Sequence, residues 1–238
     1  MRLFCIPYAG GGATTFHSWR GLLGSRGIDL CCIQLPGRET RFGDQLITTM
    51  EELVAQMCDG LNPYLEGRFA FFGYSMGALI SFEAIRELAR RGQILPEWLL
   101  ISAATPPHRR DVESVHLLPG ADFIETVARR YSGIPPDVLE NQELLDVVIP
   151  ILRADFELTE RYRYTPDKPL PVKIAAFGGR HDETVDPAEL MFWRELTALP
   201  DHFRLTLFDG DHFFLNDQGQ QLLAAIASLL TQSNRRSP

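Results

Sequence analysis

Short runs of apolar, β-branched and aromatic residues recur along the chain, and each run has the length of one strand. The runs lack a strict alternation of apolar and polar positions, which is typical of strands covered on both faces of a sheet. Patterns with helical periodicity separate them, so the sequence predicts an α/β fold with a mainly parallel sheet flanked by helices. The predicted strands are 3–6, 28–35, 69–72, 98–103, 172–177 and 203–208, and the predicted helices are 16–23, 50–61, 78–91, 188–196 and 218–230.

The segment at about 105–171 interrupts this alternation of strands and helices. It contains no convincing strand, but helical periodicity is present at 123–131 and at 144–162. Because the segment follows the predicted strand 98–103, it should lie above the carboxyl edge of the sheet. Connections of this length in compact domains usually have a function. We therefore expect a helical lid that shapes a substrate channel, with additional packing helices as the alternative.

Composition narrows the class of protein. With 238 residues, of which 45% are hydrophobic, the chain suits one well-buried core, and we expect a single domain, 1–238, with the lid inserted in it. The net charge of -8 argues against a nucleic-acid partner. No apolar run reaches the roughly 18 residues that a membrane span requires. The strand pattern at Leu3 leaves no room for a signal peptide.

The cysteines agree with an intracellular location. They lie in apolar surroundings without C-x-x-C spacing, which predicts buried free thiols and a reducing compartment. We therefore expect a cytoplasmic monomer. The four cysteines are Cys5, Cys31, Cys32 and Cys58.

A nucleophile elbow is predicted at residues 73–77, GYSMG, which fill the pattern G-x-S-x-G between a predicted strand and a predicted helix. Such a sharp turn requires glycine on both sides of the serine, here Gly73 and Gly77. The turn lifts the Ser75 hydroxyl clear of the sheet. The N–H of Met76 and the positive end of the helix dipole then point at an oxyanion formed beside the serine.

A serine hydroxyl needs a hydrogen-bonded imidazole as a base, and His212 is the best candidate in the chain. It follows the last predicted strand, so its loop should open at the same edge of the sheet as Ser75. The other histidines lie in ordinary helix, loop or lid surroundings: His17, His108, His116, His181 and His202.

The acid that orients this imidazole is predicted to be Asp182. It follows the strand 172–177, which gives the chain order serine, aspartate, histidine of α/β-hydrolases. Two acids of the same loop, Glu183 and Asp186, remain alternatives for this role. Asp209 and Asp211, which lie close to His212 in sequence, are interpreted as loop and capping residues.

The glycine-rich loop after the first strand, PYAGGG at 7–12, is predicted to supply the second oxyanion donor. It lacks the further spaced glycine of a dinucleotide fingerprint and the Gly-Lys-Ser/Thr of a phosphate-binding loop. No group of His, Cys and Asp residues has metal-ligand spacing. We therefore expect neither a cofactor nor a metal.

Several motifs together resemble the stand-alone type II thioesterases of polyketide and nonribosomal peptide synthesis. They are FCIPYAGG at 4–11, QLPGRE at 34–39, FGYSMGA at 72–78, the glycine loop before Asp182, and GDHFFL at 210–215. The resemblance spans nearly the whole chain. It implies an α/β-hydrolase fold and an enzyme that strips blocked or misprimed acyl groups from the phosphopantetheine arm of a carrier protein.

The resemblance also assigns roles to residues at matching positions. It implies that Ser75 is the nucleophile, His212 the base and Asp182 the orienting acid, while the N–H groups of Met76 and Ala9 bind the oxyanion. A carboxylesterase or lipase with the same triad is the enzyme alternative. A non-catalytic binding module is a third interpretation, although such chains usually lose a triad member.

Two further groups of residues follow from the expected lid. Apolar lid side chains are candidates for lining an acyl chamber: Leu117, Leu118, Phe123, Val127, Ile151 and Phe156. The resemblance brings an acidic carrier protein to an acidic enzyme, so docking would require a local basic patch. The candidates for that patch are Arg109, Arg110, Arg129, Arg130, Arg161 and Arg163.

Overall fold

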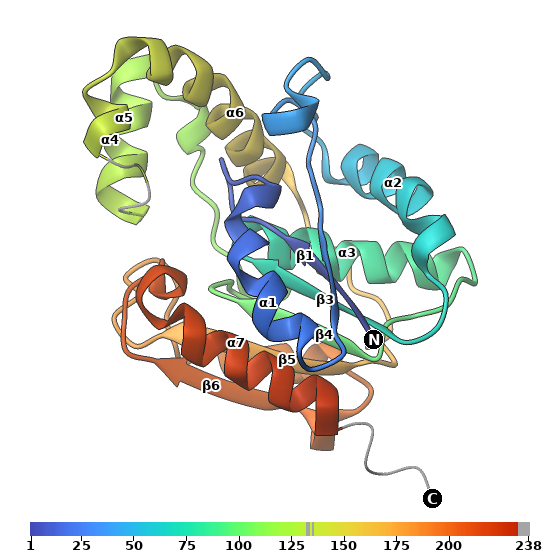
Figure 1. Cartoon of the computed structure of the whole chain (residues 1–238). Helices are drawn as coiled ribbons and strands as arrows, with labels where there is room; N and C mark the ends of the chain where they lie inside the picture. Colours follow the sequence, from blue (N-terminus) through green and yellow to red (C-terminus); the bar gives the residue numbers. More distant parts are fainter. Residues whose placement is uncertain (132–133, 135, 233–238) are drawn as a thin grey trace, which may run out of the picture.

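A computed structural model describes residues 1–131, 134 and 136–232 (Figure 1). Within these residues, six strands form one sheet in the order β2-β1-β3-β4-β5-β6. Neighbouring strands run parallel, which confirms the predicted sheet. The strands are β1 (Arg2–Ile6), β2 (Asp29–Cys32), β3 (Phe69–Tyr74), β4 (Trp98–Ser102), β5 (Lys173–Gly179) and β6 (Arg204–Phe208).

Helices cover both faces of the sheet (Figure 1). One face, with Phe4 and Phe71, packs on α2 (Met50–Leu61), α3 (Met76–Arg90) and the 3₁₀ helix η6 (Glu189–Leu196). The other face, with Leu3 and Phe72, packs on η1 (Ala13–Trp19), α1 (Arg20–Gly24) and α7 (Phe214–Gln232). Successive strand residues point to opposite faces, and both faces are buried, so the strands read as continuous apolar runs. In the described part of the chain, no helix is both long and apolar enough to cross a membrane.

Some local predictions differ from the structure. The strand expected at 28–35 ends at Cys32, before Gly37 makes a turn with φ of 78°. The helix expected at 188–196 is the 3₁₀ helix η6, and the one expected at 16–23 is split between η1 and α1. The cysteines of β2 are only half-buried, because β2 is an edge strand, while Cys5 and Cys58 are buried as predicted. Shorter 3₁₀ segments are η2 (Glu39–Arg41), η3 (Asn62–Tyr64), η4 (Pro107–Arg109), η5 (Val115–Leu117) and η7 (Pro200–His202).

In the described residues between β4 and β5, three α-helices stand to one side of the sheet (Figure 1). They are α4 (Gly120–Tyr131), α5 (Pro136–Leu139) and α6 (Gln142–Arg161). The side chain of Asn141 caps α6 by accepting hydrogen bonds from the N–H groups of Glu143 and Leu144. Helices α4 and α6 share a small core of their own, in which Phe123 of α4 packs against Phe156 of α6. This core gives the segment a defined shape above the site.

Candidate active site

The turn from β3 into α3 has the geometry of a nucleophile elbow. Ser75 has φ of 52° and ψ of −112°, a strained backbone conformation, and its N–H donates to the carbonyl of Ser102 at 2.8 Å. A Cβ on Gly73 would lie 2.2 Å from the carbonyl oxygen of Gly77. A Cβ on Gly77 would lie 2.2 Å from the carbonyl oxygen of Ile6. A side chain at Gly73 would therefore push β3 away from α3, and a side chain at Gly77 would push α3 away from β1.

The structure brings Ser75, His212 and Asp182 into one hydrogen-bonded chain. The Nε2 atom of His212 lies 3.1 Å from Ser75 Oγ, and its Nδ1 atom lies 2.9 Å from Asp182 Oδ2. The side chains of His212 and Asp182 are only 5% and 1% exposed. Gly179 allows the two loops to meet, because a Cβ there would lie 2.3 Å from the carbonyl oxygen of Asp211. The arrangement suits removal of a proton from the serine hydroxyl.

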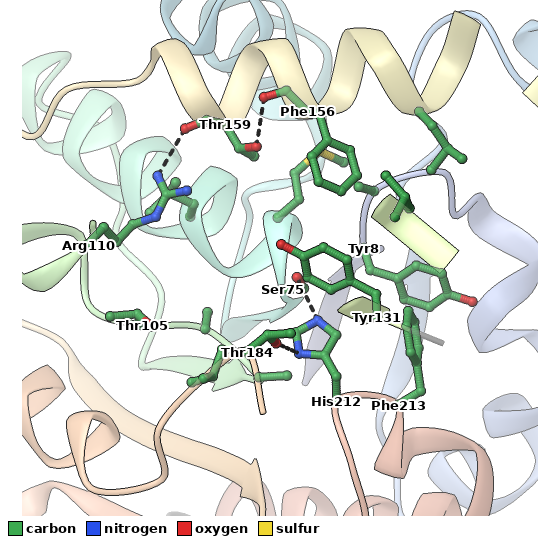
Figure 2. A pocket seen from close by; sticks show the side chains of 18 of the residues that line it. Tyr8, Ser75, Thr105, Arg110, Tyr131, Phe156, Thr159, Thr184, His212 and Phe213 are labelled. Carbon is green, nitrogen blue, oxygen red and sulfur yellow. Dashed lines mark hydrogen bonds between the residues drawn. The ribbon is translucent and has the colours of Figure 1, made fainter. Parts of the chain in front are cut away.

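Thr184 completes the surroundings of the aspartate, as Figure 2 shows for its contact with His212. Its N–H and hydroxyl both donate to Asp182 Oδ1, at 2.8 and 2.7 Å, and its Oγ1 lies 2.8 Å from His212 Nδ1. Burial by itself would raise the pKa of Asp182, but the hydrogen bonds from His212 and Thr184 hold that pKa below its ordinary value. The carboxylate therefore stays ionised beside the imidazole. The role of Thr184 was not predicted from the sequence, although Asp-x-Thr in a loop is a common turn pattern.

Tyr74 fixes the loop that carries His212. Its hydroxyl donates to the carbonyl of His212 at 2.7 Å and accepts from the N–H of Leu215 at 3.4 Å. Burial raises the pKa of Tyr74, so the hydroxyl remains a neutral donor. The ring of Tyr131, at the end of α4, packs edge-on against the His212 ring with centroids 5.2 Å apart. Helix α4 thus contacts the imidazole of His212 directly.

The other candidate acids and histidines lie elsewhere. Glu183 is exposed, and Asp186 and Asp211 accept hydrogen bonds from the main-chain N–H groups of Ala188 and Phe213, as capping residues do. Three histidines contact other acids: His108 with Glu195, His116 with Glu160 and His181 with Asp209. His17 and His202 are exposed.

The two expected oxyanion donors lie on the wall of one chamber with Ser75. In the described part of the chain, the N–H groups of Ala9 and Met76 have no hydrogen-bond acceptor. The loop that carries Ala9 is fixed on its far side, because the N–H of Gly10 donates to Asp155 Oδ2 at 2.7 Å. Both N–H groups are therefore unpaired donors among the described residues, as the predicted role as oxyanion donors requires.

A buried ion pair holds the loop that carries Ala9 and Gly10 in place. This pair was not predicted from the sequence. Arg38 donates to both carboxylate oxygens of Asp155, at 2.6 and 2.7 Å, and the two side chains are 7% and 3% exposed. Asp155 belongs to α6, so the pair joins the lid to the body beside the glycine-rich loop. The two residues are 117 positions apart in sequence, and no local pattern connects them.

The chamber above Ser75 has a volume of about 200 Å³. Of the predicted lining residues, Val127 and Phe156 face it, and they are joined by Leu79, Tyr131, Ile134, Leu152 and Val185. The other four lie outside this lining. Leu117 is 73% exposed, Leu118 is half-buried, Ile151 is buried elsewhere, and Phe123 is fully buried in the lid core. Periodicity identified the apolar positions of the lid but not which of them face the sheet.

The chamber is apolar along the lid and polar at one end. The polar end carries Thr105, Arg110, Asp111 and Thr159, whereas Thr184 lies beside His212. In Figure 2, Arg110, Thr105 and Thr159 lie to one side of Ser75, and Tyr8 and Phe213 lie to the other. A bound substrate thus meets two different environments around the serine.

Comparisons with known proteins decide the family. Residues 1–230 match the family model of the thioesterase domain. This chain belongs to the thioesterase family. GrsT, a gramicidin S biosynthesis protein of Aneurinibacillus migulanus, is 38% identical over 94% of this chain and 86% of GrsT.

Solved structures agree with the assignment. RedJ, a thioesterase from the prodiginine pathway of Streptomyces coelicolor, has a TM-score of 0.88 at 33% identity over 96% of this chain and 85% of RedJ. The type II thioesterase BorB, from the borrelidin biosynthetic cluster, has a TM-score of 0.85 at 35% identity over 96% of this chain and 92% of BorB. The resemblance to type II thioesterases is thereby confirmed.

Among the residues that the structure describes, the six arginines predicted for carrier docking differ in whether they are paired. Four of them are paired with acids: Arg109 with Glu189, Arg129 with Glu125, Arg130 with Glu113 and Arg161 with Glu157. Among the residues that the structure describes, Arg110 and Arg163 have no carboxylate partner. Arg110 donates to the carbonyl of Thr159 at 3.0 Å, and Arg163 to those of Glu160 and Tyr162 at 2.6 and 2.9 Å.

Proposed function

We propose that this thioesterase removes acyl groups from the phosphopantetheine arm of carrier proteins during polyketide or nonribosomal peptide synthesis, as an editing hydrolase. The observation that carries the proposal is the hydrogen-bonded chain of Ser75, His212 and Asp182, of which Ser75 and His212 line a chamber. The relatives named for antibiotic pathways support the biosynthetic setting.

The reaction begins at Ser75. Its Oγ attacks the thioester carbonyl while His212 Nε2 takes the hydroxyl proton, and the carbonyl oxygen gains the negative charge. The N–H groups of Ala9 and Met76 stabilise that oxyanion in the tetrahedral intermediate. When the intermediate collapses, the carbon–sulfur bond breaks and the imidazolium returns its proton to the pantetheine thiolate.

A water molecule completes the turnover. His212 removes a proton from this water as it attacks the acyl-serine, and then returns the proton to Ser75 Oγ when the free acid leaves. Asp182 keeps the Nδ1 proton of the imidazole in place and stabilises the imidazolium in both halves of the reaction. Thr184 holds the aspartate at the orientation that this requires.

The two alternatives remain distinguishable by experiment. A carboxylesterase or lipase would prefer an oxyester to a thioester of equal acyl length, and the comparison of butyryl-N-acetylcysteamine with the matched oxyester measures this preference. A binding module would show no turnover. The complete hydrogen-bonded triad favours an enzyme.

Replacement of the triad residues tests the proposal. We expect Ser75→Ala and His212→Ala to lower kcat for an acyl-carrier thioester by about a million-fold, with a smaller loss for Asp182→Asn. A fluorophosphonate probe should label the wild type and not Ser75→Ala. His181→Ala is the control, because this exposed histidine is on a neighbouring loop and contacts Asp209 rather than Ser75. Activity above a few per cent in Ser75→Ala would contradict the assignment.

A further inference from the structure

A second hollow adjoins the chamber at its polar end, and its volume is about 250 Å³. Arg110 lines both the hollow and the chamber that contains Ser75. The hollow therefore lies within the length of one arginine side chain of the catalytic chamber. Its lining consists of Pro107, Arg110, Val112, Tyr162, Arg163 and Tyr164.

The two guanidinium groups at this hollow lack a counter-ion among the described residues. The nearby carboxylate of Glu160 is taken by the N–H groups of Val115 and His116 and by the His116 ring. Asp111 lines the chamber, but it is exposed, and no ion pair joins it to Arg110 in the described part of the chain.

A second acid near the hollow is also occupied. Glu83 accepts hydrogen bonds from the Tyr162 hydroxyl at 2.5 Å and from Arg86 at 2.7 Å. Arg110 is half-buried, and burial lowers its pKa, yet a guanidinium remains charged at any pH that proteins experience. A half-buried cation without an anion is costly unless a ligand supplies the charge.

We propose that Arg110 and Arg163 bind the phosphate of the phosphopantetheine arm, and that the arm reaches Ser75 through the polar end of the chamber. This inference rests on the proposed function. Arginine suits the phosphate group because its planar N–H donors match two phosphate oxygens. Both residues donate only to main-chain carbonyls, so other N–H groups of each guanidinium remain for a ligand.

The lining between the hollow and Ser75 fits the rest of the arm. Pantetheine carries two amide groups and a hydroxyl. At this end of the chamber, Thr105 can hydrogen-bond to these groups, and Thr159, whose hydroxyl donates to the carbonyls of Asp155 and Phe156, can accept from an amide N–H. The acyl group then lies against the apolar part of the lining, which includes Val127 and Phe156. The local phosphate site also explains how an enzyme with a net charge of -8 attracts an anionic arm.

Three substrates with the same acyl group test the proposal: acetyl-4′-phosphopantetheine, acetyl-pantetheine and acetyl-N-acetylcysteamine. For the wild type, we expect kcat/KM to be about tenfold higher with the phosphate than without it, as one lost charge-assisted contact implies. Arg163→Gln should abolish most of this preference and leave hydrolysis of the N-acetylcysteamine thioester unchanged, because Arg163 does not line the chamber. Arg110→Gln, which also alters the lining of the chamber, should lower the ratio of kcat/KM with phosphate to kcat/KM without it. Arg110→Lys should restore part of it.

Control variants test whether the loss of any arginine from helices α4 and α6 lowers the preference for the phosphate. Arg129→Gln and Arg161→Gln remove guanidinium groups that already pair with Glu125 and Glu157, so the preference for phosphate should remain. A thermal melt of each variant establishes that it is folded. If Arg110→Gln does not fold, Arg163→Gln alone tests the phosphate site. We expect this variant to fold, because the Arg163 side chain is exposed and donates only to main-chain carbonyls.

Two results would overturn the inference. A wild type that does not distinguish acetyl-4′-phosphopantetheine from acetyl-pantetheine has no phosphate site, whatever the variants do. If Arg110→Gln instead impairs glutaryl-N-acetylcysteamine more than the butyryl thioester, the arginine binds a carboxylate of the acyl group. In both cases, Ser75-dependent hydrolysis of acetyl-N-acetylcysteamine would persist, so the proposed thioesterase chemistry would stand independently.

Discussion

The Asp182 carboxylate links the stability of the fold to pH. Its pKa in the folded protein lies below the ordinary value, which is about 3.9 in an unfolded chain. The hydrogen bonds to its charged form therefore contribute stability above about pH 4, and that contribution is lost as the pH falls through the folded pKa. We predict that the free energy of unfolding of the wild type exceeds that of Asp182→Asn by the largest amount at pH 6 and by less at pH 3.

Urea denaturation at pH 6, 4.5 and 3 measures this difference. Asp201→Asn is the control, because Asp201 is exposed and its side chain has no recorded contact in the described part of the chain. For this control, the difference from the wild type should be small at each pH. An Asp182→Asn penalty that stays constant from pH 6 to pH 3 would contradict the prediction.

The triad residues were predictable because each one follows a strand. Parallel strands bring their carboxyl ends to one edge, so Ser75 after β3, Asp182 after β5 and His212 after β6 were expected to meet. The supporting hydroxyl groups were not predictable in this way. Thr184 and Tyr74 act through the conformation of loops that the strand pattern does not specify.

At the scale of elements, the pair Arg38–Asp155 joins α6 to the body of the protein. Arg38→Met leaves the Asp155 charge buried with the Gly10 N–H as its remaining donor, and we expect a loss of about 3–5 kcal/mol in the free energy of unfolding. The double variant Arg38→Met/Asp155→Leu should lose less than Arg38→Met alone, because no charge is left unpaired. Chemical denaturation of the single and double variants measures the coupling.

The exposed pair of Arg41 with Asp44 offers a matched control in the same loop. Its side chains are 43% and 47% exposed, so Arg41→Met should cost less than about 1 kcal/mol. Equal losses for Arg38→Met and Arg41→Met would show that the buried pair has no special role.

The sequence predicts elements better than it predicts their connections. The positions of the six strands were evident because residues such as Phe71 and Phe72 are both buried, on opposite faces of the sheet. The 3₁₀ geometry of η6 was not evident from the sequence, since the apolar spacing of 188–196 fits either an α-helix or a 3₁₀ helix. The contact of Arg38 with Asp155 depends on tertiary packing alone.

At the scale of the whole molecule, we predict that the chamber limits the size of the acyl group that can bind. Val127 and Leu152 line it from the two lid helices, and its volume is about 200 Å³. We predict that Val127→Phe and Leu152→Phe shift the preference toward shorter acyl-N-acetylcysteamine thioesters, by the ~1–3 kcal/mol typical of pocket fit. The measurement is kcat/KM for the acetyl to octanoyl series.

Leu117→Phe provides the control for this series, because Leu117 also belongs to the lid segment but is 73% exposed and does not line the chamber. Its profile of chain lengths should match that of the wild type. An unchanged profile in both chamber variants would mean that the acyl group binds elsewhere.

The attachment of α6 determines how the roof of the chamber can rise. Raising α6 would separate the buried charges of Arg38 and Asp155. It would also part Tyr162 from Glu83, which would keep its ion pair with Arg86. Among the described residues, the contact of α4 with His212 is a ring packed on a ring, that of Tyr131. We expect such a contact to separate at a lower cost than a buried ion pair, so the roof of the chamber should open at α4 rather than at α6. An opening there would expose the His212 imidazole to bulk solvent, so the movement that admits a long acyl chain would also bring the hydrolytic water to this imidazole.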